Sequence, residues 1–449
     1  MTHDRDYQET IDYLFGLQKH GIKLALSNSA RLMNLMGDPH NRFRSVHVAG
    51  TNGKGSTSSF LASMLQAAGY RVGLYTSPHL VDFTERIRIN GEPITETKVV
   101  ELARRVRESY RQITNVTGAD RLNPTFFEVT TALAFTYFAE ERIDIAVVEV
   151  GMGGRLDSTN VITPLVSVIT NIDLEHTEFL GDTLSLIAGE KAGIIKDGVP
   201  VVTGATQPEA IEILEHAAAE KHAPLYRMPK DFLPERIASG LLRRFYYRGI
   251  RTSYPDLRVS MLGRHQVDNA CLALAAIECL REAGMAIDET AARLGLDRTK
   301  WEGRLEQVAQ RPDIYLDGAH NPASARTLAR AIAEIRPAYQ RLILVIGILG
   351  DKDYRGILAE LVPLADSVLV TKPDYGRALN VDALAAEARQ LHHAVDSAGS
   401  IAEAITTARE RAMPGDLILI TGSLYVVGDA RSLFRQDAGD SRALSGLKG

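Results

Sequence analysis

Residues 44–57, Arg44-Ser45-Val46-His47-Val48-Ala49-Gly50-Thr51-Asn52-Gly53-Lys54-Gly55-Ser56-Thr57, decide how the rest of the chain is interpreted. The segment from Ser45 to Ala49 favours a β-strand and stops at a glycine-rich turn. Apolar residues then recur at helical spacing from Ser58 to Ala68, and Gly69 stands where a helix C-cap is expected. The stretch therefore predicts a strand, a glycine loop and a helix in succession.

A glycine loop between a strand and a helix is typical of phosphate binding. Glycines let backbone N–H groups point at phosphate oxygens, the helix N-terminus adds positive potential, and Lys54 supplies a mobile charge. The general P-loop pattern asks for a glycine at Val48 and a hydroxyl at Gly55, but here the hydroxyls come one place later, at Ser56 and Thr57. An ordinary glycine-rich turn is the alternative. We favour a nucleotide site, because this loop offers little apolar surface to packing.

The composition is that of an ordinary globular protein, with 45% hydrophobic and 24% charged residues among 449. This length is enough for two or three hydrophobic cores. A formal net charge of -5 gives no electrostatic case for nucleic acid or an anionic membrane, and no apolar run is long enough to span a bilayer. The charged start lacks the apolar core of a signal peptide, and Cys271 and Cys279 are the two cysteines. These features predict a cytoplasmic protein without a disulfide framework.

Strands and helices alternate from residue 44 onward, which predicts an α/β fold with mostly parallel sheets. A second alternating series follows the linker around Trp301. We therefore expect an N-terminal P-loop ATPase domain over residues 1–300 and a smaller Rossmann-like C-terminal α/β domain over residues 301–449. Ligands of such sheets bind at the carboxyl ends of the strands. The expected strands include 71–76, 143–150, 165–170, 313–316, 341–346, 366–370 and 416–421.

Polar residues end several expected strands of the first domain. Glu149 interrupts an apolar run just before a glycine-rich turn, where a carboxylate is costly unless it is paired or bound to a cation. A salt bridge to Arg155 is the alternative to a metal. Ser77 and His176 follow two other strands, and together these groups suit a Mg²⁺ ion that keeps several waters. Imidazole is an uncommon Mg²⁺ ligand, so the spacing alone leaves the metal and structural interpretations open.

The second domain carries the polar loop Asp317-Gly318-Ala319-His320-Asn321-Pro322 at the end of its first strand. Pro322 fits the first turn of a helix, and a capping cluster is the structural interpretation of the loop. Asn269, in the helix before the linker, and Arg304, in the linker, are polar groups between the two expected domains. A cleft between domains is a common place for a ligand.

These motifs, in this order, resemble those of the folylpolyglutamate synthase/dihydrofolate synthase family of the Mur ligase superfamily. The shifted hydroxyl of the phosphate loop is that family's own form. The resemblance implies an ATP-dependent ligase that joins L-glutamate to dihydropteroate, to folylpolyglutamate or to both, through an acyl phosphate. It covers nearly the whole chain and rests on five segments: Gly50–Ser56, Thr76–Leu80, Glu149–Asp157, Gly189–Gly193 and Asp317–Pro322.

The resemblance also implies a role for each matching residue. Lys54, Lys191 and His320 are implied to be catalytic, with Lys191 carbamylated so that it becomes a carboxylate-like metal ligand; its plain interpretation is a surface pair with Glu190. The implied ligands of two Mg²⁺ ions are Ser77, Glu149, His176 and Lys191. The implied ATP contacts are Gly50, Thr51, Asn52, Gly53, Lys54, Gly55, Ser56, Thr57, Asn269, Arg304, Asp317 and His320. The implied pterin contacts are Thr125, Phe126, Phe127, Glu128, Leu156, Asp157 and Ser158, with Gly21, Ile22 and Lys23 as a weaker match.

The implied partners are small molecules only, with ATP as co-substrate and the protein as a monomer. A nucleotide-switched binding protein would need the phosphate loop but has no use for Asp317 and His320. An NAD-dependent dehydrogenase would need a G-x-G-x-x-G run, and Leu156 stands where the third glycine after Gly151 and Gly153 would be. The sequence does not separate a bifunctional enzyme from a monofunctional folylpolyglutamate synthase, so both stay open.

Overall fold

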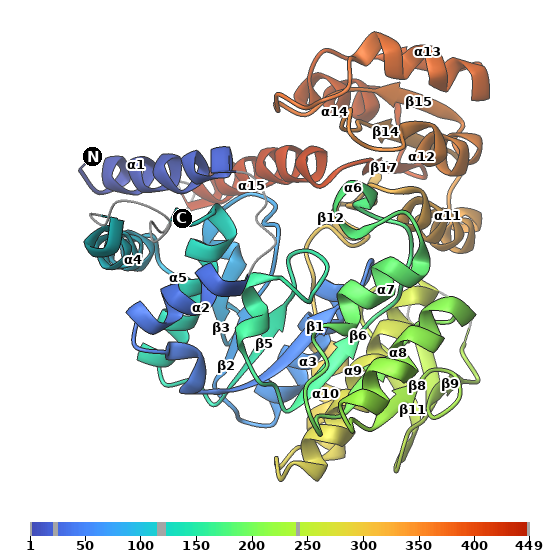
Figure 1. The fold of residues 1–449 in the computed structure, drawn as a ribbon. Coiled ribbons are helices and arrows are strands. Elements are labelled where there is room, and N and C mark those ends of the chain that lie inside the picture. Colours follow the sequence, from blue (N-terminus) through green and yellow to red (C-terminus); the bar gives the residue numbers. More distant parts are fainter. Residues whose placement is uncertain (1, 21–25, 115–122, 239–242, 447–449) are drawn as a thin grey trace. The chain divides into compact units, whose positions relative to one another are not determined.

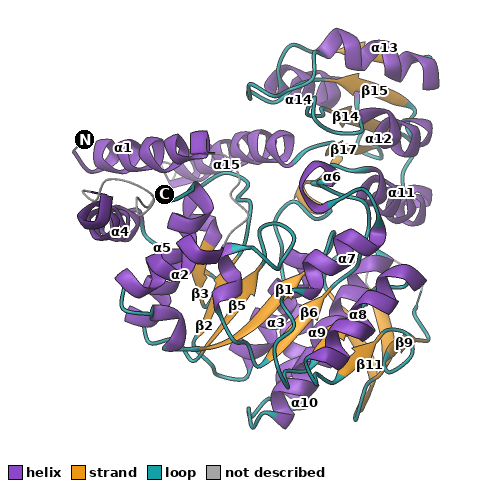
Figure 2. Ribbon diagram, in the orientation of Figure 1, coloured by secondary structure: helices purple, strands orange, loops and turns teal. Residues whose placement is uncertain are grey.

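The computed structural model describes residues 2–20, 26–114, 123–238 and 243–446, and the chain divides into two compact units (Figure 1). The first unit comprises Met1–Ile237, Arg244–Ser260 and Val267–Thr299. The second comprises Ala238–Arg243, Met261–Gln266 and Lys300–Gly449. Both are built from strands and helices that alternate along the chain, which confirms the predicted α/β class (Figure 2).

An eight-stranded sheet forms the centre of the first unit, in the order β4-β3-β2-β5-β1-β6-β7-β8. Strand β1 (Arg44–Ala49) pairs in parallel with β5 (Ile145–Glu149) and with β6 (Val166–Ile169). Their carboxyl ends therefore meet at one edge, beside the glycine loop. The other strands are β2 (Val72–Tyr75), β3 (Ile87–Ile89), β4 (Glu92–Pro93), β7 (Val201–Thr203) and β8 (Leu225–Arg227), of which β3 pairs antiparallel with β2 and β4.

Helices bury the apolar residues of this sheet. One core cluster joins Tyr75 and Val148 of the sheet to Phe135 of α5, and another joins Ile169 and Val201 to the helices that follow. Fully burying one such side chain contributes about 1.5–3 kcal/mol. The helices are α1 (Thr2–Gly16), α2 (Leu26–Leu35), α3 (Lys54–Ala67), α4 (Glu96–Thr114), α5 (Phe126–Glu140), α6 (Thr177–Leu180), α7 (Leu184–Ala192), α8 (Pro208–Glu220), α9 (Arg264–Glu282) and α10 (Glu289–Arg298).

The first unit also holds a three-stranded sheet, with the order β11-β10-β9. Its strands are β9 (Leu233–Glu235), β10 (Arg243–Arg248) and β11 (Ser253–Val259). Cys271 and Cys279 are free and buried in α9. Among the described residues, no helix has both the length and the hydropathy needed to cross a membrane.

The second unit is a six-stranded sheet in the order β12-β13-β17-β14-β15-β16, parallel except for β12 against β13. Strand β13 (Asp313–Leu316) leads into the loop that contains Asp317 and His320. The other strands are β12 (Glu306–Ala309), β14 (Leu342–Ile346), β15 (Ser367–Val370), β16 (Val395–Ser397) and β17 (Leu417–Thr421). The helices are α11 (Pro322–Ile335), α12 (Tyr354–Leu361), α13 (Val381–Leu391), α14 (Ile401–Arg411) and α15 (Leu424–Gly446).

The expected helix after the glycine loop was wrong at its start. Helix α3 begins at Lys54, directly after Gly53, and not at Ser58. Its first turn contains only polar residues and glycine, so apolar periodicity carries no signal there. The early start matters for the site, because it places the N-terminus of α3, with its unpaired backbone N–H groups, within the glycine loop.

Candidate active site

Two glycines give the loop after β1 its shape. Gly50 has a φ of 140°, and a Cβ on it would lie 1.9 Å from the Thr170 hydroxyl. Gly53 has a φ of 83°, and a Cβ on it would lie 2.5 Å from the Asn269 side-chain oxygen. Larger residues are therefore excluded from both positions. The close approach at Gly53 also brings Asn269 of α9 to the loop, as expected for a residue that contacts the same ligand.

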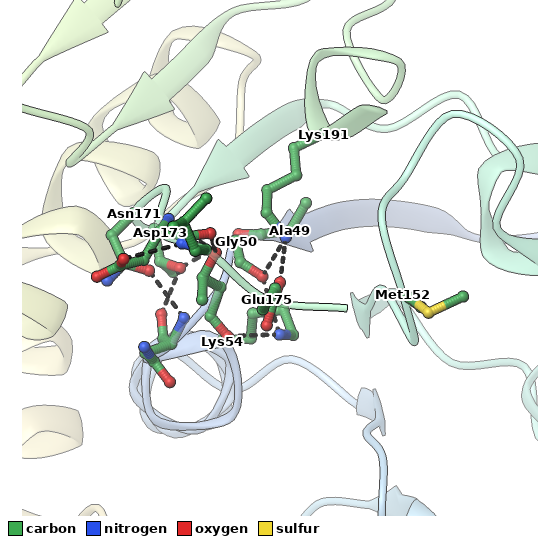
Figure 3. Close-up of polar contacts among 12 residues, drawn as sticks. Ala49, Gly50, Lys54, Met152, Asn171, Asp173, Glu175 and Lys191 are labelled. Carbon is green, nitrogen blue, oxygen red and sulfur yellow. Dashed lines mark hydrogen bonds and ion pairs between the residues drawn. The ribbon is translucent and has the colours of Figure 1, made fainter. Parts of the chain in front are cut away.

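Two lysine side chains converge on the carbonyl of Gly50 (Figure 3). The Lys54 ammonium donates to Gly50 O at 2.9 Å and to Thr51 O at 3.0 Å. The Lys191 ammonium, from α7, donates to the same Gly50 O at 2.9 Å. Lys191 is only 1% exposed, so the interpretation as a surface Glu-Lys pair was wrong, and Glu190 pairs with Arg155 instead. The charges of buried Lys191 and half-buried Lys54 thus gather where phosphate oxygens are expected.

Glu175 balances this charge, and sequence reasoning did not select it. Its Oε1 accepts from the Lys191 ammonium at 2.5 Å (Figure 3). Burial raises the pKa of Glu175, but Lys54 and Lys191 outweigh that effect and hold the pKa below its usual value. Burial lowers the pKa of Lys191 to about 8, although Glu175 opposes the shift. The signal that could have identified Glu175 is a carboxylate in the loop after β6, where the neighbouring His176 was instead predicted as a metal ligand.

The loop that follows β6 supports the glycine loop through a lattice of hydrogen bonds. The side-chain oxygen of Asn171 accepts from the backbone N–H of Asn52 at 2.8 Å. The backbone carbonyl of Asn171 accepts from the backbone N–H of Thr51 at 3.0 Å. The Thr51 hydroxyl donates to Asp173 O at 3.1 Å and accepts from the Asp173 N–H at 3.0 Å. These bonds hold the backbone of the glycine loop against the loop after β6 (Figure 3).

Two of the expected metal ligands lie side by side. Glu149, 5% exposed at the end of β5, accepts from the backbone N–H of Ser77 at 3.2 Å. Arg155, the alternative partner for Glu149, pairs with Glu190 at 2.7 Å. A carboxylate beside a hydroxyl residue suits a hard cation that keeps several waters. No group of three or more His, Cys, Asp and Glu side chains that could hold a metal is found in the described part of the chain.

His176 takes an unusual backbone position. It lies in the left-handed region, with a φ of 46°, as the N-cap residue of the short helix α6. Such a conformation is uncommon for a residue other than glycine and is often found at functional sites. His176 directly follows Glu175, which reaches Lys191, so the same loop serves the charged cluster.

The loop from Gly151 to Asn160 uses its own carboxylate to hold its shape. Asp157 Oδ2 accepts from Met152 N at 3.0 Å, and Oδ1 accepts from Thr159 N at 3.0 Å. Burial raises the pKa of the Asp157 carboxyl, while hydrogen bonds from Thr159, Met152 and Gly151 oppose the shift. The resemblance implies a pterin contact for Asp157, and the structure also gives this carboxylate a capping role. The capping role is present, because Asp157 is the N-cap residue of a short 3-10 helix (Ser158–Val161).

The start of α5 lies against this loop. Thr125 and Glu128 form a capping box, in which each side chain accepts from the backbone N–H of the other residue. A Cβ on Gly151 would lie 2.5 Å from the ring of Phe127, so that ring covers the loop. Phe126 is 9% exposed and stacks on Phe15 at 5.5 Å. The expected pterin residues of α5 and of the 151–160 loop are therefore neighbours, whereas Gly21, Ile22 and Lys23 lie outside the described residues.

In the second unit, two expected ATP contacts, Asp317 and His320, share the loop after β13, and the third, Arg304, lies just before β12. Asp317 accepts from Leu305 N at 3.0 Å and from Ala319 N at 2.9 Å, and burial raises its pKa while Arg304 opposes the shift. His320 Nδ1 lies 2.8 Å from Gly318 O. Asn321 caps α11 in a capping box with Ser324, as the structural interpretation had proposed.

Comparison with known proteins shows where this geometry belongs. Residues 48–277 match the Mur ligase middle domain, and residues 303–424 match the Mur ligase, glutamate ligase domain. A Bacillus subtilis protein named dihydrofolate synthase/folylpolyglutamate synthase is 38% identical over 95% of this chain and 98% of its own. The chain belongs to the dihydrofolate synthase/folylpolyglutamate synthase family of Mur ligases. This Mur ligase is therefore an ATP-dependent enzyme that forms amide bonds, and the predicted resemblance is confirmed.

Two further relatives of this Mur ligase bear on its activity. A Lacticaseibacillus casei protein named folylpolyglutamate synthase is 37% identical over 95% of this chain and 98% of its own. The solved structure of Mycobacterium tuberculosis folylpolyglutamate synthase complexed with ADP is 36% identical, with a TM-score of 0.90, and covers 96% of this chain and 99% of its own. Relatives of this Mur ligase thus carry either one or both activity names.

Proposed function

We propose that the enzyme joins L-glutamate to dihydropteroate and also to folylpolyglutamate, with ATP as the co-substrate. The observation that supports this most is the convergence of Lys54 and Lys191 on Gly50 O, within a fixed glycine loop, in a chain of this family. Within the described part of the chain, the Lys54 ammonium bonds neutral carbonyls and the Lys191 ammonium bonds one carbonyl and Glu175. Phosphate oxygens would be stronger partners than these carbonyls.

The chemistry follows in two steps. A carboxylate oxygen of the folate substrate attacks the γ-phosphorus of ATP, the bond to the bridging oxygen breaks, and ADP leaves. Lys54 and the N-terminus of α3 stabilise the charge that develops on the transferred group. The glutamate amine then attacks the acyl carbon, phosphate leaves, and the amine loses a proton. We propose that Gly50–Thr57 and Asn269 contact ATP from the first unit and that Arg304, Asp317 and His320 contact it from the second.

Ser77 and Glu149 would hold a Mg²⁺ ion, with His176 as a further ligand. When bound, this ion would offset charge on the phosphates. The neighbouring positions of Ser77 and Glu149 fit that role. We propose Lys191 as the ligand of a second ion in its carbamylated form, which would replace the present contact with Glu175.

We propose the division into an ATP-binding domain, residues 1–300, and a C-terminal ligase domain, residues 301–449. We also propose a monomer working in the cytoplasm, where the buried free thiols of Cys271 and Cys279 would stay reduced. Light scattering on the purified protein gives the oligomeric state directly, and a dimer mass would refute the monomer.

A monofunctional folylpolyglutamate synthase is the second candidate. The observation that favours it is that both oxygens of Asp157 already accept hydrogen bonds within their own loop, which weakens the case for direct pterin recognition by this residue. The Lacticaseibacillus casei relative carries that single name.

An ATP-consumption assay separates the two candidates. The enzyme is given L-glutamate with dihydropteroate and, separately, with tetrahydrofolate, and ADP release is followed. Turnover with both supports the bifunctional enzyme, and turnover with tetrahydrofolate alone leaves the monofunctional one. ATP hydrolysis that ignores glutamate would contradict both.

A further inference from the structure

A buried histidine ties the strand of the phosphate loop to the loop beside it. His47 lies on β1 and has no exposed surface, although the strand around it is apolar. His47 pairs in register with Val148 of β5, so the His47 ring and the Val148 side chain lie on the same face of the sheet. There its Nε2 is 2.8 Å from the hydroxyl oxygen of Thr159, at the far end of the 151–160 loop.

The direction of these hydrogen bonds is fixed by the carboxylate at their end. Asp157 accepts a backbone N–H on each oxygen, so it acts as the acceptor, and the Thr159 hydroxyl donates to Oδ1 at 2.5 Å. That hydroxyl has a single proton, so its remaining contact must accept from His47 Nε2–H. Within the described residues, His47 Nδ1 is buried and has no hydrogen-bond partner. The hydrogen bond to Thr159 is therefore the polar contact that offsets the burial of this ring.

The His47–Thr159–Asp157 chain is one of several ties on the loop. Arg155 N donates to Glu190 O at 2.7 Å. The Asn160 side chain donates to Arg155 O and to Gly193 O, each at 3.0 Å. These ties join the loop to the end of α7, which carries Lys191. The tie through His47 differs from them, because it starts on the strand that leads directly into Gly50.

We propose that His47 is a positioning residue that sets the 151–160 loop for the folate substrate. It acts through the Thr159 hydroxyl on Asp157 and so on the backbone from Met152 to Ser158. One strand then holds both the phosphate loop at its end and the neighbouring substrate loop at its side. This inference rests on the proposed folate substrate of the same site.

The test compares variants that keep or remove the hydrogen bond at similar volume. His47→Leu and Thr159→Val remove it, whereas His47→Gln and Thr159→Ser keep a donor and a hydroxyl. We expect KM for dihydropteroate to rise about tenfold in the first pair, since one unmade buried hydrogen bond changes an equilibrium by roughly this factor. KM for ATP should change by less than about twofold, and the second pair should stay within about threefold of wild type.

The double variant His47→Leu/Thr159→Val gives a readout that a packing role would not produce. Because both residues act in one chain, its KM for dihydropteroate should match that of the worse single variant, whereas independent packing losses would multiply. If His47→Leu does not fold, the KM for dihydropteroate of Thr159→Val is compared with that of Thr159→Ser, which tests the same hydrogen bond.

Three results would overturn the inference. These are an unchanged KM for dihydropteroate in folded Thr159→Val, an equal rise in KM for ATP, and multiplied effects in the double variant. Wild-type enzyme that turns over neither dihydropteroate nor tetrahydrofolate would overturn the proposed function and this inference together, whereas the three results above leave the proposed function standing.

Discussion

Two neighbouring loops at the carboxyl edge of one sheet use charge in opposite ways. In the loop after β1, Lys54 donates to carbonyls of its own loop at 2.9 and 3.0 Å. Bonds to phosphate oxygens could replace these two bonds at little cost in free energy. In the loop after β5, Asp157 accepts two backbone N–H groups and a hydroxyl, and these would be left unpaired without it. The first charge is available to a ligand and the second maintains the fold. A charged residue in a binding motif can therefore serve either purpose.

The largest expected effect comes from the available charge. Lys54→Ala should lower turnover by roughly 100- to 1,000-fold or more, because it removes a cation from a phosphoryl-transfer site. The fold should survive, since Gly50 O still accepts from the Lys191 ammonium. Steady-state kinetics and circular dichroism measure the two properties. Lys221→Ala is the matched control, since its ammonium pairs with an exposed carboxylate at 3.4 Å. Near-normal turnover in folded Lys54→Ala would remove the basis of the comparison.

Lys191 extends the comparison to a buried amine. Lys191→Ala should lower activity by roughly 10- to 100-fold, the usual cost of losing a group that organises a metal site. If Lys191 acts as a carbamate, formate or acetate should restore part of the activity, because a small carboxylate can enter the space left by the side chain. No rescue, with no electron density beyond the ammonium in crystals of the wild type, would mean that Lys191 acts as a plain cation.

The metal ligands test whether the edge between the two loops holds an ion. Glu149→Gln and His176→Ala should each raise the Mg²⁺ concentration needed for half-maximal activity by about 10-fold or more, because waters replace a lost ligand only partly. Glu190→Gln is the control, since its carboxylate pairs with Arg155 instead. Magnesium titrations identical to wild type in both variants would assign Glu149 and His176 to the fold alone.

The smallest effect on activity is expected from the charge that maintains the fold. Asp157→Ala should destabilise the protein by about 1–3 kcal/mol, since it leaves buried donors unpaired. It should also weaken the use of dihydropteroate more than the binding of ATP. Thermal unfolding and the two KM values measure these effects. Equal losses for both substrates would show a general folding defect, and unchanged stability would contradict the structural role.

The sequence indicated the first loop better than the second. The strand from Arg44 to Ala49 and the polar loop after it follow from local pattern, because glycine and strand propensity act within a few residues. Glu175 was missed because it lies in a loop and its partner, Lys191, lies in helix α7, so only the fold brings them together. His47 was missed for the same reason, since its hydrogen-bond partner, Thr159, is distant in sequence. Helix α10 was also not expected, although Asp288 caps it; the helix packs on α3, where Gly295 lies against Met64.

Hydrogen exchange of the two loops, measured with and without a non-hydrolysable ATP analogue and Mg²⁺, tests the comparison most directly. The amides of Lys54, Gly55 and Ser56 stand in the first turn of α3, where no intrahelical acceptor exists. They should exchange fast in the free enzyme and slow down when nucleotide binds. The amides of Met152 and Thr159, already bonded to Asp157, should be protected in both states. Fast exchange at Met152 and Thr159 in the free enzyme, or unchanged exchange at Lys54–Ser56 with bound nucleotide, would contradict the account.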